Sequence, residues 1–276
     1  MADIDFLRVH AEGSPERPAL ILGERVVDFA TLSGRADRAA HVFTDLGCEP
    51  RDRIAIMSFN SISGSEIANG ARRSRAVVVP VNYRLRGSEV AYVLNDSGAR
   101  VVCADADHVD VVDAARPELK GERHYIATGS KVPDGWTSYE DLMRAASESP
   151  VEGDGSGGLG ASMIYTSGTT GHPKGAWRPN GVNIENVLQV ISIFELDHRD
   201  VHLWCGRDTT AAWRSSSRCT RCSARPTSSS RNSKPTARST SSSVTGSRQR
   251  SSRRRCCSAL SMPSSNSRVT SRRCAR

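Results

Sequence analysis

The sequence that organises this chain is Ile164-Tyr165-Thr166-Ser167-Gly168-Thr169-Thr170-Gly171-His172-Pro173-Lys174-Gly175. An apolar run at 163–165 predicts the end of a buried strand, and it opens into a loop of glycine and hydroxyl residues. Glycines let the backbone adopt positive φ and approach a ligand closely, so that successive N–H groups can converge on an anion. Hydroxyl groups add donors, and Lys174 adds a mobile positive charge. The loop therefore predicts a polyphosphate site.

The order of residues in this loop is not that of a Walker A motif, because His172 and Pro173 separate Gly171 from the lysine and Gly175 follows it. The order Tyr-Thr-Ser-Gly-Thr-Thr-Gly-x-Pro-Lys-Gly instead resembles the phosphate loop of the adenylate-forming superfamily, which contains acyl-CoA synthetases, firefly luciferase and the adenylation domains of peptide synthetases. The alternative is a Ser/Gly-rich surface linker with a chance lysine. A linker needs neither the preceding strand nor so long an ordered match.

The resemblance implies a role for each residue of the loop. The residues expected to bind the β- and γ-phosphates of ATP are Thr166, Ser167, Gly168, Thr169, Thr170 and Gly171. Lys174 is the expected catalytic residue, and it would also bind the phosphates and accompany the departing pyrophosphate. The alternative for one or two of the hydroxyl groups is local capping of the backbone within a turn.

Composition divides the chain of 276 residues after Leu203. Residues 204–276 hold 21 Ser, 16 Arg, one Lys and one Asp, so this segment carries a formal charge of +16 and residues 1–203 carry −8. Six of the eight cysteines also lie in 204–276, and only Cys48 and Cys103 precede it. An acidic segment with two scattered cysteines is typical of a reducing compartment. The basic pI therefore belongs to the C-terminal segment alone.

The N-terminal residues show neither the basic region nor the apolar region of a secretory signal. No apolar run approaches the length of a membrane span. The sequence therefore predicts a cytoplasmic protein without a membrane-spanning segment.

Short apolar segments alternate with helical patterns, which indicates an α/β fold with a parallel sheet. The expected strands are 54–57, 76–81, 100–104, 124–127 and 163–165, with a hairpin at 18–29 and the start of a strand at 201–203. The expected helices are 6–15, 29–46, 60–75, 89–95 and 182–194, together with one through Val109 and Val112. The continuous β-branched run at 76–81 is typical of a strand covered on both faces.

Four further segments resemble the adenylate-forming family and occur in the expected order: Asp28-Phe29-x-x-Leu32, Asp52-Arg53-Ile54-Ala55-Ile56, Val79-Pro80-Val81-Asn82-Tyr83-Arg84-Leu85 and Asp96-Ser97-Gly98-Ala99-Arg100. The resemblance covers 18–203. It implies that 1–152 form the N-terminal α/β portion of an AMP-binding domain and that 153–203 contain the phosphate-loop strand and the following helix. Residues 204–276 form a separate Ser/Arg-rich tail.

Three interpretations of the tail follow from its composition. Its scarcity of aliphatic residues predicts disorder. Its arginines would bind nucleic acid non-specifically through the phosphates, although an aromatic stacking surface is missing, and Cys219-x-x-Cys222 has no second metal-ligand pair. The third interpretation is a frameshift near Leu203, because Ser, Arg, Cys, Thr and Pro are the residues that a GC-rich gene yields out of frame. Sequencing the gene around codon 203 tests the frameshift interpretation.

The family resemblance implies an AMP-forming acid:thiol ligase, most similar to a fatty-acyl-CoA synthetase. Such a ligase converts a carboxylic acid, ATP and CoA to acyl-CoA, AMP and pyrophosphate, and it uses Mg²⁺. The partners implied are a small-molecule carboxylic acid and a nucleotide. The family's later Tyr-Gly-x-Thr-Glu segment and C-terminal lysine are absent, so we expect negligible ligase activity from this chain. Alternatives are an adenylation enzyme of another branch, a nucleotide-binding regulator, and a nucleic-acid-binding protein acting through its basic tail.

Overall fold

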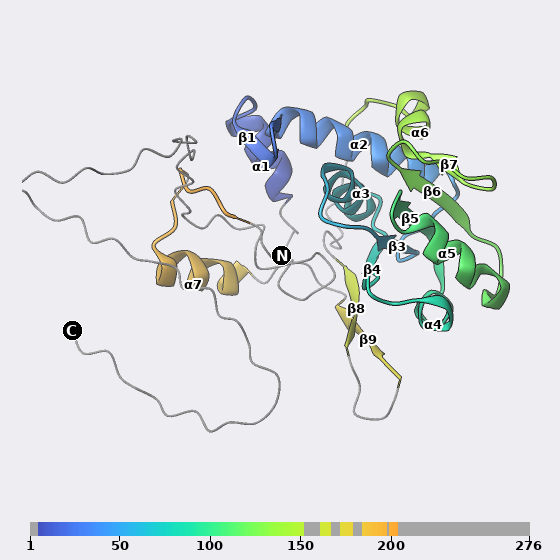
Figure 1. The fold of residues 1–276 in the computed structure, drawn as a ribbon. Coiled ribbons are helices and arrows are strands. Elements are labelled where there is room, and N and C mark those ends of the chain that lie inside the picture. The colour runs from blue at the N-terminus through green and yellow to red at the C-terminus, as the bar shows by residue number, and fades with distance from the viewer. Residues whose placement is uncertain (1–4, 152–160, 167–171, 179–183, 198, 204–276) are drawn as a thin grey trace, which may run out of the picture. The chain divides into compact units, whose positions relative to one another are not determined.

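The computed structural model describes residues 5–151, 161–166, 172–178, 184–197 and 199–203, all within 1–225 (Figure 1). Among these residues a seven-stranded sheet has the order β7-β6-β5-β3-β4-β8-β9. Its strands are β3 (Arg53–Met57), β4 (Val77–Pro80), β5 (Ala99–Asp105), β6 (His124–Thr128), β7 (Thr137–Ser138), β8 (Ser162–Thr166) and β9 (Lys174–Arg178). All neighbouring strands pair in parallel except β8 and β9, which pair antiparallel. The predicted α/β fold with a parallel sheet is confirmed.

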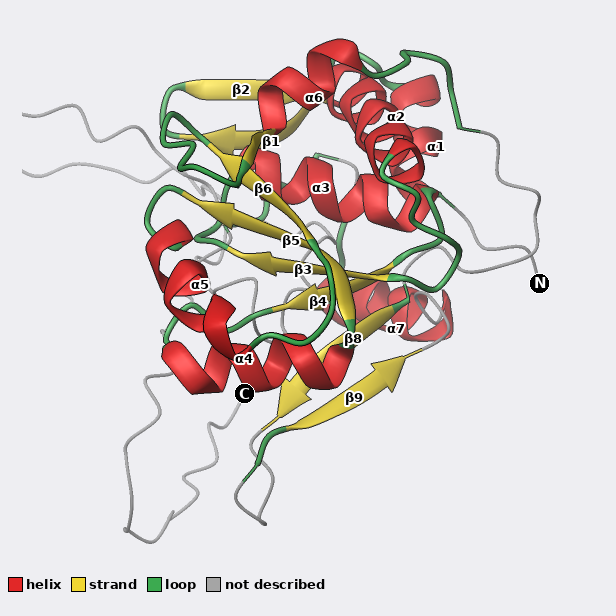
Figure 2. Ribbon diagram, turned by 90° about the vertical axis from the view of Figure 1, so that its right-hand side faces the viewer, coloured by secondary structure: helices red, strands yellow, loops and turns green. Residues whose placement is uncertain are grey.

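Helices cover both faces of this sheet, as Figure 2 shows. One face carries α2 (Phe29–Asp45), α3 (Ile62–Arg73) and α6 (Tyr139–Ala145), and the other carries α4 (Gly87–Ser97) and α5 (Val109–Ala115), which continues into the 3₁₀ helix η1 (Arg116–Glu118). Outside these layers lie α1 (Phe6–Gly13), a separate hairpin of β1 (Pro18–Leu22) and β2 (Arg25–Asp28), and α7 (Ile184–Phe194).

The two-residue period of the strands determines which side chains enter each layer of the hydrophobic core. Ile54, Val78 and Val101 face α2 and α3, whereas their neighbours along each strand face α4 and α5. All four residues of β4 are buried, which confirms the prediction from its β-branched run. Successive side chains of a strand point to opposite faces, so each central strand supplies both layers of the core.

Several elements differ from the sequence-based predictions. Residues 201–203 form no strand. The sequence analysis missed β9, whose sequence Lys-Gly-Ala-Trp-Arg lacks an apolar alternation and which pairs only with β8 among the described strands. It also missed β7 and α6, although Ser138 caps α6 by accepting a hydrogen bond from the Asp141 N–H at 3.3 Å.

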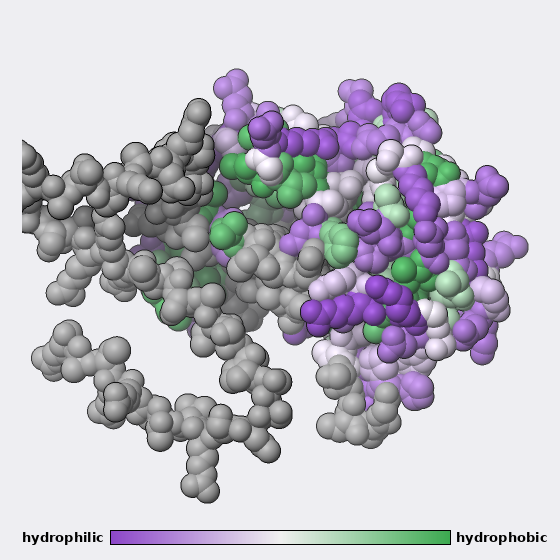
Figure 3. Space-filling view, in the orientation of Figure 1, coloured by the Kyte–Doolittle hydropathy of each residue, from purple (hydrophilic) through white to green (hydrophobic). Residues whose placement is uncertain are grey.

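Figure 3 shows a largely hydrophilic surface with a hydrophobic area over the β1–β2 hairpin. The exposed apolar side chains of this hairpin are Ile21, Leu22 and Val26. In the described part of the chain, no helix has both the length and the apolar character needed to cross a membrane.

The predicted tail, 204–276, lies outside the described residues. Its disorder, its nucleic-acid binding and its origin by frameshift stay predictions. The predicted domain boundaries at 152/153 and 203/204 adjoin residues outside the description and stay predictions as well.

The two cysteines of the described chain are free and buried. Burial, and then the nearby Asp52 charge, raise the pKa of Cys48 to about 11, and burial raises the pKa of Cys103 further. Only the thiolate is nucleophilic. We therefore expect iodoacetamide at neutral pH to leave both thiols unmodified in the folded protein and to modify them in urea. Peptide-resolved mass spectrometry checks this, and modification of Cys103 without denaturant would contradict the buried placement.

Candidate phosphate-binding hairpin

The glycine-rich loop connects two antiparallel strands. Thr166, the last residue of β8, is the register partner of Lys174, the first residue of β9. The structure therefore brings together the two ends of the predicted phosphate loop, which are eight positions apart in the sequence. The remaining predicted site residues, Ser167, Gly168, Thr169, Thr170 and Gly171, lie outside the described residues.

Burial along β8 decreases toward the loop. Ser162 and Ile164 are buried, Tyr165 is half-buried and Thr166 is exposed. Lys174 is also exposed, and none of the ion pairs within the described ranges includes its ammonium group. A hydroxyl group and an ammonium group thus stand exposed across the hairpin. This pair suits a phosphate, because both groups donate hydrogen bonds and one carries positive charge.

The hairpin projects from the edge of the sheet where ligands of α/β proteins bind. Because β8 runs parallel to β4, and β4 parallel to β3, Thr166 lies at the carboxyl ends of these strands. Ligands of open α/β sheets bind in the crevice outside the carboxyl ends of the strands. The position of the loop is therefore consistent with ligand binding.

Contacts from α4 reach both sides of the hairpin. The Tyr165 hydroxyl donates to Asp96 Oδ2 at 2.6 Å, and the Tyr92 hydroxyl donates to the Pro173 carbonyl at 3.1 Å. The Tyr92 ring also stacks on the His172 ring, with 5.0 Å between the two centroids. The sequence analysis did not identify these helical residues, because no local pattern links α4 to a loop some 70 residues later.

A second polar cluster lies at the carboxyl ends of β3 and β5. Asp105 accepts a hydrogen bond from the Phe59 N–H at 2.7 Å, and its other oxygen lies 2.5 Å from His108 Nδ1. His108 is only 3% exposed, and the Phe59 ring contacts it edge-on with 4.7 Å between centroids. The Phe59 and His108 rings therefore fill the space beside Asp105, and the contact between His108 and Asp105 fixes the turn after β5.

Arg84 and His202 are further polar residues of the described chain, and the contacts of Arg84 are structural. Arg84 Nε donates to the Tyr83 hydroxyl at 3.1 Å, and its guanidinium lies over the Tyr83 ring. His202 is half-buried, and burial lowers its pKa. Within the described part of the chain, no three His, Cys, Asp or Glu side chains are placed to hold a metal ion.

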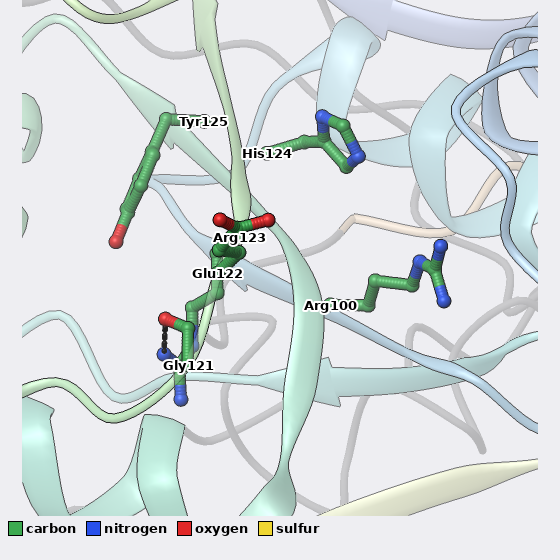
Figure 4. Close-up of a pocket in the computed structure, with 6 residues that line it drawn as sticks. All are labelled: Arg100, Gly121, Glu122, Arg123, His124 and Tyr125. Carbon is green, nitrogen blue, oxygen red and sulfur yellow. Dashed lines mark hydrogen bonds between the residues drawn. The ribbon is translucent and has the colours of Figure 1, made fainter.

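A pocket of about 610 Å³ lies at the opposite, amino-terminal edge of the sheet (Figure 4). Its lining residues are Arg100, Gly121, Glu122, Arg123, His124 and Tyr125. The Arg123 guanidinium donates to three backbone carbonyls, of Lys120, Gly121 and Leu94, and to Asn95 Oδ1. Because this arginine already holds the chain before β6, the pocket is less suited to an anion than the exposed end of the hairpin.

Comparison with known proteins gives consistent results. The family model of AMP-binding enzymes matches residues 7–207. The long-chain-fatty-acid–CoA ligase FadD13 of Mycobacterium tuberculosis is 36% identical over 177 residues, which are 62% of this chain and 33% of the ligase. The fatty acid–[acyl-carrier-protein] ligase ScoC of Streptomyces coeruleorubidus is 33% identical over 169 residues, which are 60% of this chain and 30% of the relative.

Solved structures show the same relationship. The inhibitor-bound N-terminal domain of FACL13 from Mycobacterium tuberculosis has a TM-score of 0.66 and 29% identity, over 79% of this chain and 54% of that one. A fatty acyl CoA synthetase from the same organism has a TM-score of 0.58 and 30% identity, over 70% of this chain and 38% of that one. The chain spans about a third of the length of the curated relatives described above. Because the family model covers well over half of its residues, this chain belongs to the family of AMP-binding enzymes.

Proposed function

We propose that this chain supplies the nucleotide-phosphate site of an AMP-forming ligase that activates a carboxylic acid. In that reaction a carboxylate oxygen attacks the α-phosphorus of ATP, the bond to the β-phosphate oxygen breaks, and an acyl-adenylate and pyrophosphate form. A thiol, that of CoA, then takes the acyl group and AMP leaves. The observation that carries the proposal is the exposed Thr166–Lys174 pair at the carboxyl edge of the sheet, in a chain of the AMP-binding family.

The residues at the hairpin fit the phosphates of ATP. The Lys174 ammonium is free of ion pairs within the described residues, and Thr166 provides a donor opposite it. We infer that Lys174 neutralises charge on the β- and γ-phosphates and on the departing pyrophosphate, where developing charge needs stabilisation. The backbone and hydroxyl donors predicted for 167–171 would supply the remaining contacts to the phosphates. Mg²⁺, when bound to ATP, would share the neutralisation of phosphate charge.

Binding of Mg·ATP to the full chain tests the proposal. Replacing Lys174 with alanine removes a charge-assisted contact, so we expect a dissociation constant about tenfold or more above that of the unchanged chain. Isothermal titration calorimetry measures the affinity. Lys131→Ala is the matched control, because Lys131 is also exposed but pairs with Asp110 away from the hairpin. Equal affinities of the Lys174→Ala and Lys131→Ala variants would refute the assignment.

The acceptor of the acyl group has a second candidate. The relative ScoC is named as a ligase of fatty acids to acyl-carrier protein, at an identity close to that of FadD13. A carrier-protein thiol is therefore the alternative to CoA. Because we expect negligible ligase activity from this chain, the two are distinguished by binding: isothermal titration calorimetry of the full chain with CoA and with an acyl-carrier protein shows which acceptor it recognises.

A further inference from the structure

The hairpin of β8 and β9 has a short attachment to the sheet. Strand β8 pairs with β4 only through Val78 and Ser162, at the end of β8 farthest from the loop. The backbone hydrogen bond of this pairing, from the Val78 N–H to the Ala161 carbonyl at 3.2 Å, lies at the same end. The loop end, with Thr166 and Lys174, extends beyond this ladder. A hairpin attached at one end needs another support if its far end is to hold a fixed position.

Helix α4 provides that support on both sides of the hairpin. Asp96 accepts the hydrogen bond of Tyr165, the residue before Thr166, and Tyr92 donates to the carbonyl of Pro173, the residue before Lys174. Tyr92 and Asp96 are four positions apart, so they lie on the same face of α4. One helical face thus contacts the chain immediately before each of the two proposed phosphate ligands.

The supporting side chains are themselves held in place. The rings of Tyr92 and Tyr165 pack against the core cluster beneath α4. The Tyr165 ring lies over Gly175 on the opposite strand, where a Cβ would come within 3.2 Å of Tyr165 Cζ. Burial, and then the Asp96 carboxylate, raise the pKa of Tyr165, so its hydroxyl remains a donor at neutral pH.

We propose that Tyr92 and Asp96 are positioning residues, which clamp both sides of the hairpin so that Thr166 and Lys174 face the same polyphosphate. This inference rests on the proposed function of the hairpin. A site whose ligands are held in advance by supporting hydrogen bonds loses less ordering entropy when it binds. Loss of either contact therefore weakens phosphate binding without removing any group that touches phosphate.

Three variants of the full chain test the clamp. Tyr92→Phe removes one hydroxyl and keeps the ring on His172, Asp96→Ala removes the acceptor of Tyr165, and Asp96→Asn keeps an acceptor at that position. Because each contact is one hydrogen bond, Tyr92→Phe and Asp96→Ala should each raise the dissociation constant of Mg·ATP about three- to tenfold, and Asp96→Asn should restore most of the affinity. Tyr125→Phe, on β6, is the matched control, and it should leave the affinity unchanged.

Hydrogen exchange without nucleotide provides a second, independent measurement. The amides of 161–166, 172 and 174–178 should exchange faster in Tyr92→Phe and Asp96→Ala, whereas those of β3 and β5 should not. The melting temperature should stay close to that of the unchanged chain. Unchanged exchange in the hairpin would overturn the clamp. So would faster exchange throughout the sheet, or an Asp96→Asn variant as weak as Asp96→Ala. If the unchanged chain fails to bind Mg·ATP while hairpin exchange still rises in the variants, the proposed function fails and the clamp stands.

Discussion

Replacing Glu66 with alanine is expected to lower the free energy of unfolding by about 3 kcal/mol, because it leaves a guanidinium and a phenol without their buried acceptor. Glu66 lies on α3 with its side chain 1% exposed. Arg35 Nε of α2 lies 2.5 Å from Glu66 Oε1, and the Tyr139 hydroxyl of α6 donates to Oε2 at 3.2 Å. One carboxylate therefore connects three helices on the same face of the sheet.

The Tyr139 hydroxyl stays protonated at neutral pH, which preserves its hydrogen bond to Glu66. Burial, and then the Glu66 charge, raise the pKa of Tyr139 well above its usual value, so its hydroxyl keeps its proton and donates. Arg35 is partly exposed, and in the Glu66→Ala variant it keeps a second partner, Glu140, at 2.7 Å. We therefore expect the loss in free energy of unfolding to lie near the lower end of the range for broken buried ion pairs.

Urea unfolding followed by circular dichroism measures the effect of Glu66→Ala. The matched control is Glu140→Ala, which removes the other carboxylate of the same arginine. The Glu140 side chain is 53% exposed, so its loss should cost no more than about 1 kcal/mol. Equal effects of the two variants would show that the buried position of Glu66 contributes nothing beyond a surface ion pair.

Replacing Gly70 with valine is expected to destabilise the fold by about 3 kcal/mol, because the helices α2 and α3 touch at this residue. A Cβ at Gly70 would lie 2.4 Å from Ala39 Cβ and 3.0 Å from the Ala36 carbonyl oxygen. These atoms belong to short side chains and backbone, which cannot move aside. The helices must separate to admit the new side chain, and overpacking of this kind costs about 1–3 kcal/mol or more. The higher helix propensity of valine offsets only a few tenths of a kcal/mol.

The control for Gly70 is another glycine in a helix of the same layer. Gly34 lies in α2, and among the described residues a Cβ there would have no heavy atom within 4 Å apart from the neighbouring backbone of its own helix. Gly34→Val should therefore leave the free energy of unfolding nearly unchanged or raise it slightly, and the urea midpoints of the two variants should differ clearly. A Gly70→Val variant as stable as Gly34→Val would show that the close approach of α2 and α3 is not required.

The sequence alone determined the α/β class, most elements and the location of the loop between Thr166 and Lys174. These properties depend on residues close together in the chain. A two-residue or 3.6-residue period is visible in any short window, and the run at 76–81 is apolar because β4 is covered on both faces. A phosphate loop is likewise indicated by its local run of glycine and hydroxyl residues, because the groups that would bind the anion are neighbours in the chain.

Only the tertiary structure decided how the two ends of the loop are supported. Strand β9 forms because β8 offers it a hydrogen-bonding partner, and its own residues carry little strand pattern. Gly70 weakens a helix when the sequence is considered alone, but in the fold it allows two helices to touch. The contacts of Tyr92 and Asp96 with the hairpin depend on how α4 lies against a segment 69 to 81 residues later. Such contacts arise from packing between distant segments, and the energy of that packing has no signature in a local stretch of sequence.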